Sequence, residues 1–336
     1  MSAPLPRRLA PGATLLLVVA VCFVATPQLS GGSLDLGVTI LCYLAIAQAW
    51  NVLAGFAGQM SLGAAAFVAT GGYTTALLMA RASVSWIWAL PCAALAAAAL
   101  AALLSVPLLR LRGDYFAVGT LAISIATQAL ISNWQWAGGA SGLTLPISEV
   151  PSGGRLFQLA VVVAAIGAAV TLYVRQSAFG LRLAAIRDNE PAAAGLGVAV
   201  FRHRLAALLL SSAITGLAGA VIAFQFIVVS PDGIASVNWS LNAVLMTVVG
   251  GAGTVFGPVL GVMVVYYGLT RELQDQQTFS EVIEGVLLIA IVRFTPQGAW
   301  PVLCSLARRL AGVRPVKPAE RAGSATSTAE PSLEIV

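Results

Sequence analysis

The stretch from Trp86 to Leu109, WIWALPCAALAAAALAALLSVPLL, contains no charged side chain. A helix of about 20 apolar residues is long enough to cross the ~30 Å hydrocarbon core of a bilayer. An uncharged stretch of this length is unusual inside a soluble domain, where about a quarter of the residues are charged. The stretch therefore predicts a transmembrane helix, and it sets the class of fold for the whole chain.

Similar apolar runs recur along the sequence. The chain has 336 residues, of which 59% are hydrophobic and 9% charged, and its mean hydropathy is +0.91. The alternation of apolar and polar residues that marks an outer-membrane barrel is absent. We therefore predict an all-α, polytopic integral membrane protein with about nine or ten transmembrane helices. The runs cover residues 13–29, 34–54, 60–80, 86–109, 115–132, 156–174, 205–229, 238–268 and 280–300.

Basic residues next to the runs predict the orientation, because cytoplasmic loops are enriched in arginine and lysine. The loops near residues 134–155 and 230–238 are expected outside. Residues 1–312 are expected to form one transmembrane domain that keeps its first helix. The tail 313–336 is rich in Pro, Ser, Ala and Glu and is expected to be a disordered cytoplasmic segment. The basic clusters expected in the cytoplasm are Arg7 with Arg8, Arg110 with Arg112, residues 175–204 and residues 308–321.

Residue counts exclude several kinds of active site. Lys317 is the only lysine and lies outside any phosphate-binding motif, so we expect no ATPase site. His203 is the only histidine, which excludes a histidine-based triad or a multi-histidine metal site. The four cysteines have no metal-binding spacing. The net charge of +5 comes from basic residues beside the apolar runs, so it does not indicate nucleic-acid binding. We expect no enzyme activity, cofactor or metal.

The segment from Trp50 to Leu78, WNVLAGFAGQMSLGAAAFVATGGYTTALL, combines glycines with polar residues inside an apolar run. Asn51, Gln59 and Ser61 are the polar residues that we select as candidates to line a translocation path. Irregular backbone at membrane depth is tolerated only where protein or water covers it. The segment predicts either a broken helix along such a path or a helix that packs closely through small residues.

A second glycine-rich segment lies in the other half of the chain, from Val248 to Gly268, VVGGAGTVFGPVLGVMVVYYG. Pro258 removes a backbone donor and should interrupt the helix. The run 238–268 is therefore expected to form two passes or a re-entrant piece, as in transporters with paired discontinuous helices. Gly250, Gly251 and Gly253 are further candidates for the path. The G-x-x-x-G spacings of Gly253, Gly257 and Gly261 predict a close helix-packing face.

A short charged segment, AAIRDNEPAAAGLGV from Ala184 to Val198, separates two long apolar runs. Pro191 suits the first turn of a helix, and Glu190 before it suits the positive end of the helix dipole. We expect one or two short cytoplasmic helices within residues 177–200 whose small residues let another protein approach closely. A solvated loop is the alternative. The candidate coupling residues are Arg187, Asp188, Glu190, Ala192, Ala193 and Gly195.

Four stretches resemble the permease subunits of branched-chain amino acid ABC importers, and more narrowly the LivM-like subunits. They are GFAGQMSLGAAAF, LRLRGDYFAVGTLA, FGLRLAAIRDNEPAAAGLGV and VSPDGIASVNWSLNAVLMTVVGGAGTVFGPVLG, and the resemblance runs from about Leu34 to Pro301. It implies an all-helical permease in a bacterial cytoplasmic membrane. Its partners would be a second homologous permease, two cytoplasmic ATP-binding subunits and an extracytoplasmic solute-binding protein. The family's EAA…G coupling pattern matches Glu190, Ala192, Ala193 and Gly195, with Pro191 inserted.

The resemblance implies ATP-driven import of branched-chain amino acids or a related small solute. Importers of urea and short amides share these motifs, so an ABC permease for such solutes is an alternative. Ala64 stands where the family usually has a histidine, which is a departure at a position that could contact the solute. A stand-alone secondary transporter is a further alternative. Such proteins tend to place ionisable residues at the membrane midplane, where they relay protons or ions. None of the first seven apolar runs has an acidic residue at its centre. A scaffold without transport is disfavoured by the two glycine-broken segments.

Overall fold

The computed structural model describes residues 19–23, 26, 31–266, 286 and 300. In these residues the fold is helical apart from one two-residue strand pair. The predicted runs 13–29 and 280–300 and the predicted tail 313–336 lie mainly or wholly outside the described residues. The total of nine or ten transmembrane helices therefore stays a prediction.

The order of elements follows the predicted apolar runs. Among the described residues, six segments are long and apolar enough to cross a membrane, which confirms the all-α polytopic class. The elements are α2 (Gly31–Trp50), the π-helix η2 (Asn51–Phe56), α3 (Ala64–Ala82), α4 (Trp86–Leu108), α5 (Asp114–Asn133), η3 (Gln135–Ala137), η4 (Gly139–Ser141), β1 (Leu143–Thr144), η5 (Ile147–Glu149), α6 (Gly153–Gln176), α7 (Ala178–Asp188), α8 (Glu190–Gly195), α9 (Val200–Phe226), β2 (Val228–Val229), α10 (Pro231–Ile234), α11 (Asn238–Gly250) and α12 (Gly257–Val265).

Alanines on α4 set its packing against α9. Ala89, Ala93, Ala97 and Ala101 follow one another at four-residue spacing, and each is fully buried. Residues four apart share one face of a helix. Small side chains let two membrane helices approach closely and gain van der Waals contact. The bulkier Leu95 and Leu103 point outward instead and are exposed, as expected for side chains that face lipid.

Helix α3 lies at the centre of the bundle and packs closely on α9. A Cβ at Gly71 would overlap the backbone of Gly216, and one at Gly219 would overlap the carbonyl group of Val68. These contacts require glycine because backbone meets backbone. Helix α3 was predicted as the run 60–80, and the structure places more than half of its residues in the core.

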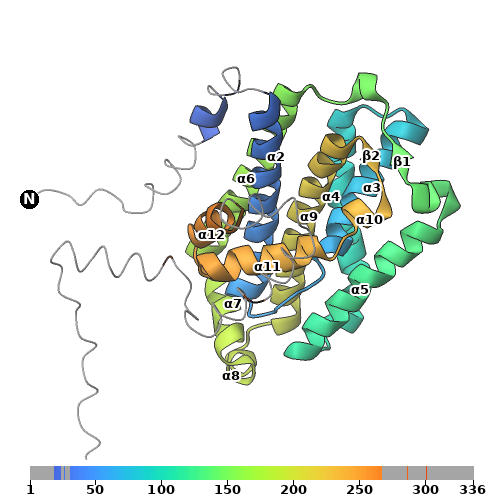
Figure 1. The fold of residues 1–336 in the computed structure, drawn as a ribbon. Coiled ribbons are helices and arrows are strands. Elements are labelled where there is room, and N and C mark those ends of the chain that lie inside the picture. The colour runs from blue at the N-terminus through green and yellow to red at the C-terminus, as the bar shows by residue number, and fades with distance from the viewer. Residues whose placement is uncertain (1–18, 24–25, 27–30, 267–285, 287–299, 301–336) are drawn as a thin grey trace, which may run out of the picture.

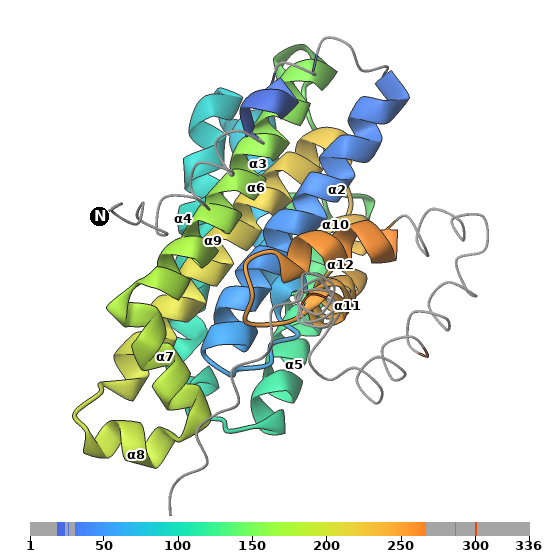
Figure 2. The same cartoon turned by 90° about the vertical axis from the view of Figure 1, so that its left-hand side faces the viewer.

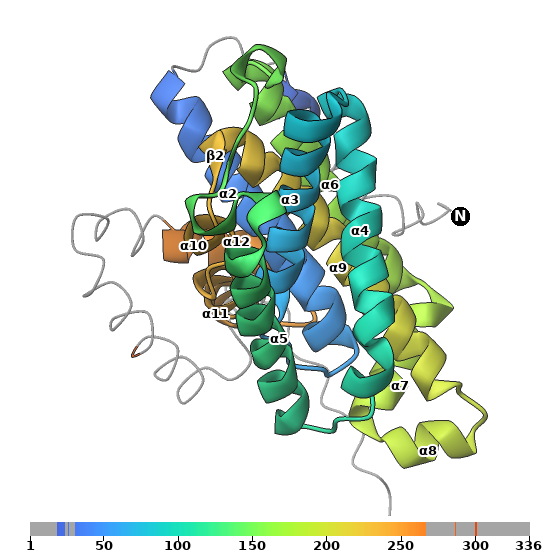
Figure 3. The same cartoon turned by 90° about the vertical axis from the view of Figure 1, so that its right-hand side faces the viewer.

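The two ends of the bundle carry different elements. Strands β1 and β2 pair antiparallel at one end, with Leu143 opposite Val229, so they join the two loops predicted to lie outside. Helices α7 and α8 lie at the other end (Figures 1 and 2). Helix α5 runs along one side of the bundle and is tilted relative to α9 (Figures 1 and 3). The β1–β2 pair and the helices α7 and α8 thus lie at opposite ends of the bundle, and the cytoplasmic location of α7 and α8 stays a prediction.

Candidate functional site

The first glycine-rich segment forms a broken helix. Helix α2 continues into the π-helix η2, which ends at Phe56, and α3 begins only at Ala64. Gly58 has φ +70° in the intervening chain, a left-handed conformation that suits glycine. π-helices are rare and often occur at functional sites. The interruption that the sequence predicted is therefore present, at residues 57–63.

Side chains from other helices satisfy the backbone of residues 57–63. The indole nitrogen of Trp50 donates to the Ser61 carbonyl group at 2.7 Å. The amide of Leu62 donates to Thr120 Oγ1 at 2.9 Å, and Ser124 Oγ donates to the Leu62 carbonyl group at 3.0 Å. Because unpaired backbone groups are costly inside a membrane, these bonds make the irregular segment possible. The sequence analysis did not select Thr120 and Ser124, although isolated hydroxyl groups in an apolar helix are typical interhelical donors.

The second glycine-rich segment is also broken. Helix α11 ends at Gly250 and α12 begins at Gly257, and Gly251 and Gly253 have φ values of +116° and +77°. Helix α11 has 13 residues, which at 1.5 Å per residue is about 20 Å, less than a bilayer core. With α10 the segment reaches membrane-spanning length, but residues 235–237 interrupt the helix.

Helices α11 and α12 run across the long helices of the bundle (Figures 1 and 2). The described part of the run 238–268 therefore contains the short crosswise helix α11, the break 251–256 and α12 (Gly257–Val265). The interruption that the sequence predicted is present, and the choice between two passes and a re-entrant piece stays a prediction.

Close packing of α11 on α12 uses glycines, but the set differs from the predicted one. A Cβ at Gly261 would overlap the Met246 carbonyl group, and one at Gly250 would overlap the Gly257 carbonyl group. Gly253 was predicted to share the packing face of Gly257 and Gly261, but it lies in the break and on neither helix. The prediction for Gly253 is wrong because the helix begins after it. Gly250 of α11 takes its place, because the backbone of α11 contacts the backbone of α12 there.

The two breaks meet each other at Asn51. Its Nδ2 donates to the Thr254 carbonyl group at 2.7 Å, and its Oδ1 accepts from the Gly253 amide at 2.7 Å. One turn earlier, Gln48 Nε2 donates to the Val255 carbonyl group at 2.9 Å. We call these contacts of Gln48 and Asn51 with residues 253–255 the break junction. The sequence selected Asn51 and Gly253 separately, and the fold brings them into direct contact.

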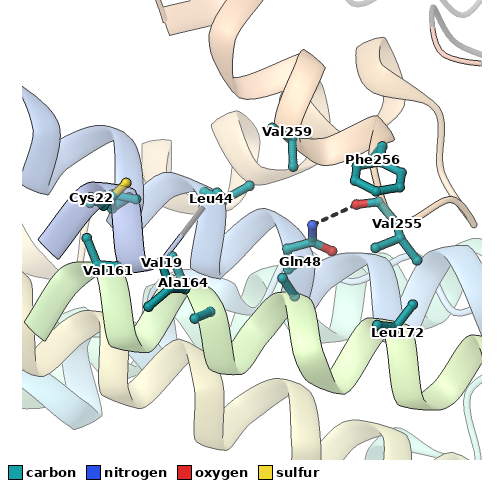
Figure 4. Close-up of a pocket in the computed structure, with 13 residues that line it drawn as sticks. Val19, Cys22, Leu44, Gln48, Val161, Ala164, Leu172, Val255, Phe256 and Val259 are labelled. Carbon is teal, nitrogen blue, oxygen red and sulfur yellow. Dashed lines mark hydrogen bonds between the residues drawn. The ribbon is translucent and has the colours of Figure 1, made fainter. Parts of the chain in front are cut away.

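Gln48 also borders an apolar cavity of about 170 Å³. The cavity lies between α2, α6 and the start of α12, and Figure 4 shows the Gln48 amide reaching across to the Val255 carbonyl group. Gln48 is fully buried, and its Oε1 has no hydrogen-bond partner in the described part of the chain. The sequence analysis missed Gln48, although a single amide one turn before Asn51 in an apolar run was a usable signal.

The remaining path candidates are largely enclosed in this conformation. Asn51 and Ser61 are buried and bonded within the chain. Gln59 is also buried, and it borders a cavity of about 50 Å³ together with Arg112 and Glu190. Its Oε1 has no partner among the described residues. The small cavity lies between the first break, the connection from α4 to α5 and the predicted coupling segment around Glu190.

The predicted coupling segment forms two short helices, as expected. Ser177 Oγ accepts from the Gly180 amide at 3.3 Å at the start of α7, and Asn189 Oδ1 accepts from the Ala192 amide at 3.0 Å at the start of α8. Such caps satisfy free amides in a first helical turn. Pro191 occupies the first turn of α8, where its missing amide hydrogen has no cost. The segment is therefore ordered by its own sequence and is not a simple solvated loop.

The charged residues of this segment bond mainly within the chain. Arg204 Nη2 of α9 lies 2.9 Å from Glu190 Oε2, and the two side chains are 14% and 31% exposed. Arg187 Nη1 donates to the Gly55 carbonyl group at 2.8 Å, and its Nε lies 3.1 Å from Asp188 Oδ1. The Asp188 side chain is 68% exposed. Of the predicted coupling charges, Asp188 is thus the most available to a partner.

The small residues of α8 divide into a buried side and an exposed side. Ala193 is only 2% exposed and faces the chain itself, so the prediction that it belongs to a face open to a partner is wrong. Ala192 and Gly195 are exposed, and Leu196 after them is 85% exposed. No other large hydrophobic side chain among the described residues is as exposed as Leu196. The exposed face of α8 is therefore formed by Ala192, Gly195 and Leu196.

Comparisons with known proteins agree with this architecture. The chain is 29% identical to the high-affinity branched-chain amino acid transport system permease proteins LivM of Salmonella typhimurium and Escherichia coli K12, over 85% of this chain and 74% of each relative. It is 26% identical to the probable branched-chain amino acid transport permease protein LivM of Methanocaldococcus jannaschii, over 60% of this chain and 64% of the relative. No solved structure matches significantly. The profile of a family described as "branched-chain amino acid transport system / permease component" matches residues 33–292, and the chain therefore belongs to this permease family.

Proposed function

We propose that this chain is a permease subunit of an ATP-driven importer in a bacterial cytoplasmic membrane. It pairs with a second homologous permease and with two cytoplasmic ATP-binding subunits, and an extracytoplasmic binding protein delivers the solute. The permease family and the LivM relatives support this assignment. The chain supplies the path, and the partner subunits hydrolyse ATP, since its only lysine is not in a phosphate-binding motif.

The observation that carries the proposal is the exposed face of α8. Helices α7 and α8 lie at the end of the bundle that is predicted to be cytoplasmic (Figures 2 and 3). There an apolar side chain has no lipid to contact, yet Leu196 is 85% exposed beside Ala192 and Gly195. An exposed apolar side chain directly after a short, capped helix of small residues leaves room for another protein to approach closely, and the family's coupling pattern matches this same segment. The ATP-binding subunit is the partner that this location favours.

Charge placement disfavours the stand-alone secondary transporter. In the described long helices, the acidic and basic residues lie near the ends, as Asp35 of α2, Arg81 of α3 and Arg175 of α6 do. A proton- or ion-coupled carrier usually needs such groups near the midplane. The energy for import then comes from outside this chain.

The solute is proposed from the relatives, whose names specify branched-chain amino acids. Urea and short amides are the alternative solutes because importers of those solutes share the motifs found here, and Ala64 replaces the family's usual histidine. Ala64 begins α3 and is buried next to the first break. Competition of urea or acetamide with labelled leucine separates the two classes of solute.

The experiment is purification and reconstitution of the complete complex with labelled leucine as the probe. We expect Leu196→Glu to abolish copurification of the ATP-binding subunit and ATP-dependent uptake, because a charge enters an apolar contact. Ile147→Glu is the matched control: Ile147 is 73% exposed in η5 at the opposite end, so the ATP-binding subunit should still copurify. Wild-type copurification and uptake by Leu196→Glu would refute docking at α8. Uptake by this chain alone on a proton or sodium gradient would refute the importer.

A further inference from the structure

Arg187 connects the coupling helix to the first break. It lies in the last turn of α7, and its Nη1 donates to the Gly55 carbonyl group at 2.8 Å. Its side chain is 42% exposed, and its Nε pairs with Asp188. Hydrogen bonds from a charged donor are stronger than neutral ones. The contact therefore ties a helix outside the bundle to backbone inside it.

The Gly55 carbonyl group needs a donor from elsewhere because the helix ends there. After η2, the amide of Gly58 donates to the Ala54 carbonyl group at 3.1 Å, and that of Gln59 donates to Leu53 at 3.2 Å. Neither of these two amides donates to the Gly55 carbonyl group. The guanidinium group of Arg187 supplies the missing donor, as free carbonyls at a helix C-terminus require.

Gly58 makes room for the Arg187 side chain, and the close approach of Gly55 to Gly253 brings the second break next to it. A Cβ at Gly58 would lie 2.5 Å from Arg187 Cγ, closer than real side chains approach. A Cβ at Gly55 would lie 2.5 Å from the Gly253 amide nitrogen, and one at Gly253 would lie 3.8 Å from Arg187 Nη1. The arginine thus occupies a slot between the first break and the second. Arginine suits this position because its planar group donates in several directions at once.

The same π-helix carries both Gly55 and Asn51. Asn51 bonds the Gly253 amide and the Thr254 carbonyl group of the second break. The six-residue helix η2 therefore links the Arg187 contact at Gly55 to the Asn51 contacts with residues 253–254. The connection runs from α7 through Arg187 to η2 and then to the α11–α12 break, and each link is a hydrogen bond of 2.8 Å or less.

We propose that Arg187 is a positioning residue that transmits movement of the coupling segment to both helix breaks. This inference rests on the proposed importer function. Docking and transmission are separate tasks here: the exposed face of α8 recruits the ATP-binding subunit, and Arg187 passes its movement into the membrane. Loss of Arg187 then uncouples ATP hydrolysis from transport without preventing docking.

The test measures leucine transported per ATP hydrolysed by the complete complex in proteoliposomes, together with copurification of the ATP-binding subunit. We expect Arg187→Gln to lower this ratio at least tenfold while copurification stays at the wild-type level. Arg187→Lys, which keeps the charge but reaches less far, should give an intermediate ratio. Arg175→Gln is the matched control, because Arg175 is an exposed arginine at the end of α6 near the same end of the bundle. It should change the ratio less than twofold.

A second variant leaves the arginine in place. Gly58→Ala pushes a methyl group against Arg187 Cγ and should reproduce the low ratio with copurification intact. If Arg187→Gln does not accumulate in the membrane, Gly58→Ala replaces it as the test variant. A wild-type ratio of leucine transported to ATP hydrolysed in the variant that is tested overturns the proposal. Loss of copurification in Arg187→Gln also overturns it, since Arg187 would then serve docking. Failure of the wild-type chain to bind any ATP-binding subunit contradicts the proposed function instead.

Discussion

At the scale of single residues, Asn51 shows how one side chain holds two broken segments together. It is fully buried, and both ends of its amide bond backbone groups of residues 253–254. A buried backbone group that loses its partner costs about 1–3 kcal/mol. The amide is therefore a structural bridge in this conformation as well as a candidate for the translocation path.

We predict that Asn51→Leu, which keeps the approximate volume but removes both bonds, lowers the free energy of unfolding by about 2 kcal/mol or more. The measurement is thermal or denaturant unfolding of the purified permease complex in detergent. Asn133→Leu is the control, because Asn133 is exposed on α5 and its side chain, within the part of the chain that the structure describes, bonds only the Ala129 carbonyl group of its own helix. Equal stability of the two variants would mean that the break junction contributes little.

At the scale of elements, α11 and α12 depend on backbone contact. Gly250, Gly257 and Gly261 lie where any side chain would overlap the facing backbone. The contact between α11 and α12 sets the position of residues 251–256 relative to Asn51. Overpacking such a contact typically costs about 1–3 kcal/mol.

We predict that Gly257→Leu destabilises the complex by about 1–3 kcal/mol, since its Cβ would overlap the Gly251 carbonyl group and Thr254 Oγ1. Recovery of intact complex after detergent extraction and heating gives the measurement. Gly32→Leu is the control, because a Cβ at Gly32 meets nothing within 4 Å. A Gly257→Leu complex with wild-type thermal stability and uptake would show that the close packing is incidental.

The coupling segment depends on the ion pair of Glu190 with Arg204, which joins the start of α8 to α9. We predict that Glu190→Arg releases α8 and lowers uptake and association of the ATP-binding subunit. The double variant Glu190→Arg with Arg204→Glu should recover most of both, because it restores opposite charges. A coupling free energy of about 0.5 kcal/mol or more in this double-mutant cycle supports an internal brace. If the losses caused by the two single variants simply add in the double variant, Glu190 instead contacts the ATP-binding subunit.

At the scale of the whole molecule, the two ends of the bundle differ in chemistry. One end carries the β1–β2 pair and the connection before α6, and the other carries α7 and α8 (Figure 1). Arginines gather at the second end, as the positive-inside rule requires of the cytoplasmic side.

We predict that a cysteine at Asn189 is labelled only from the cytoplasm and one at Gly153 only from outside. Both positions are exposed, so a membrane-impermeant maleimide can reach them. The background variant has the four natural cysteines replaced, which removes competing labels. Labelling of both positions from the same side would contradict the orientation and, with it, docking at α8.

The sequence by itself determined the class of fold and the places where helices break. These are local properties: the length of an apolar run fixes whether a helix spans the membrane, and glycine and proline fix where it is interrupted. The sequence also indicated α7 and α8 through Ser177, Asn189 and Pro191, whose effects act within one helical turn.

Only the tertiary structure decided which faces meet. In a membrane helix the lipid-facing and buried residues are both apolar, so periodicity does not identify the packed face. Val106 and Leu108 of α4 illustrate this, because the first is exposed and the second buried. On α8 the neighbouring residues are all small, so the sequence did not separate buried Ala193 from exposed Ala192 and Gly195. The contacts of Asn51 with Gly253 and of Arg187 with Gly55 join residues that are 202 and 132 positions apart, and the packing of the whole bundle decides such contacts.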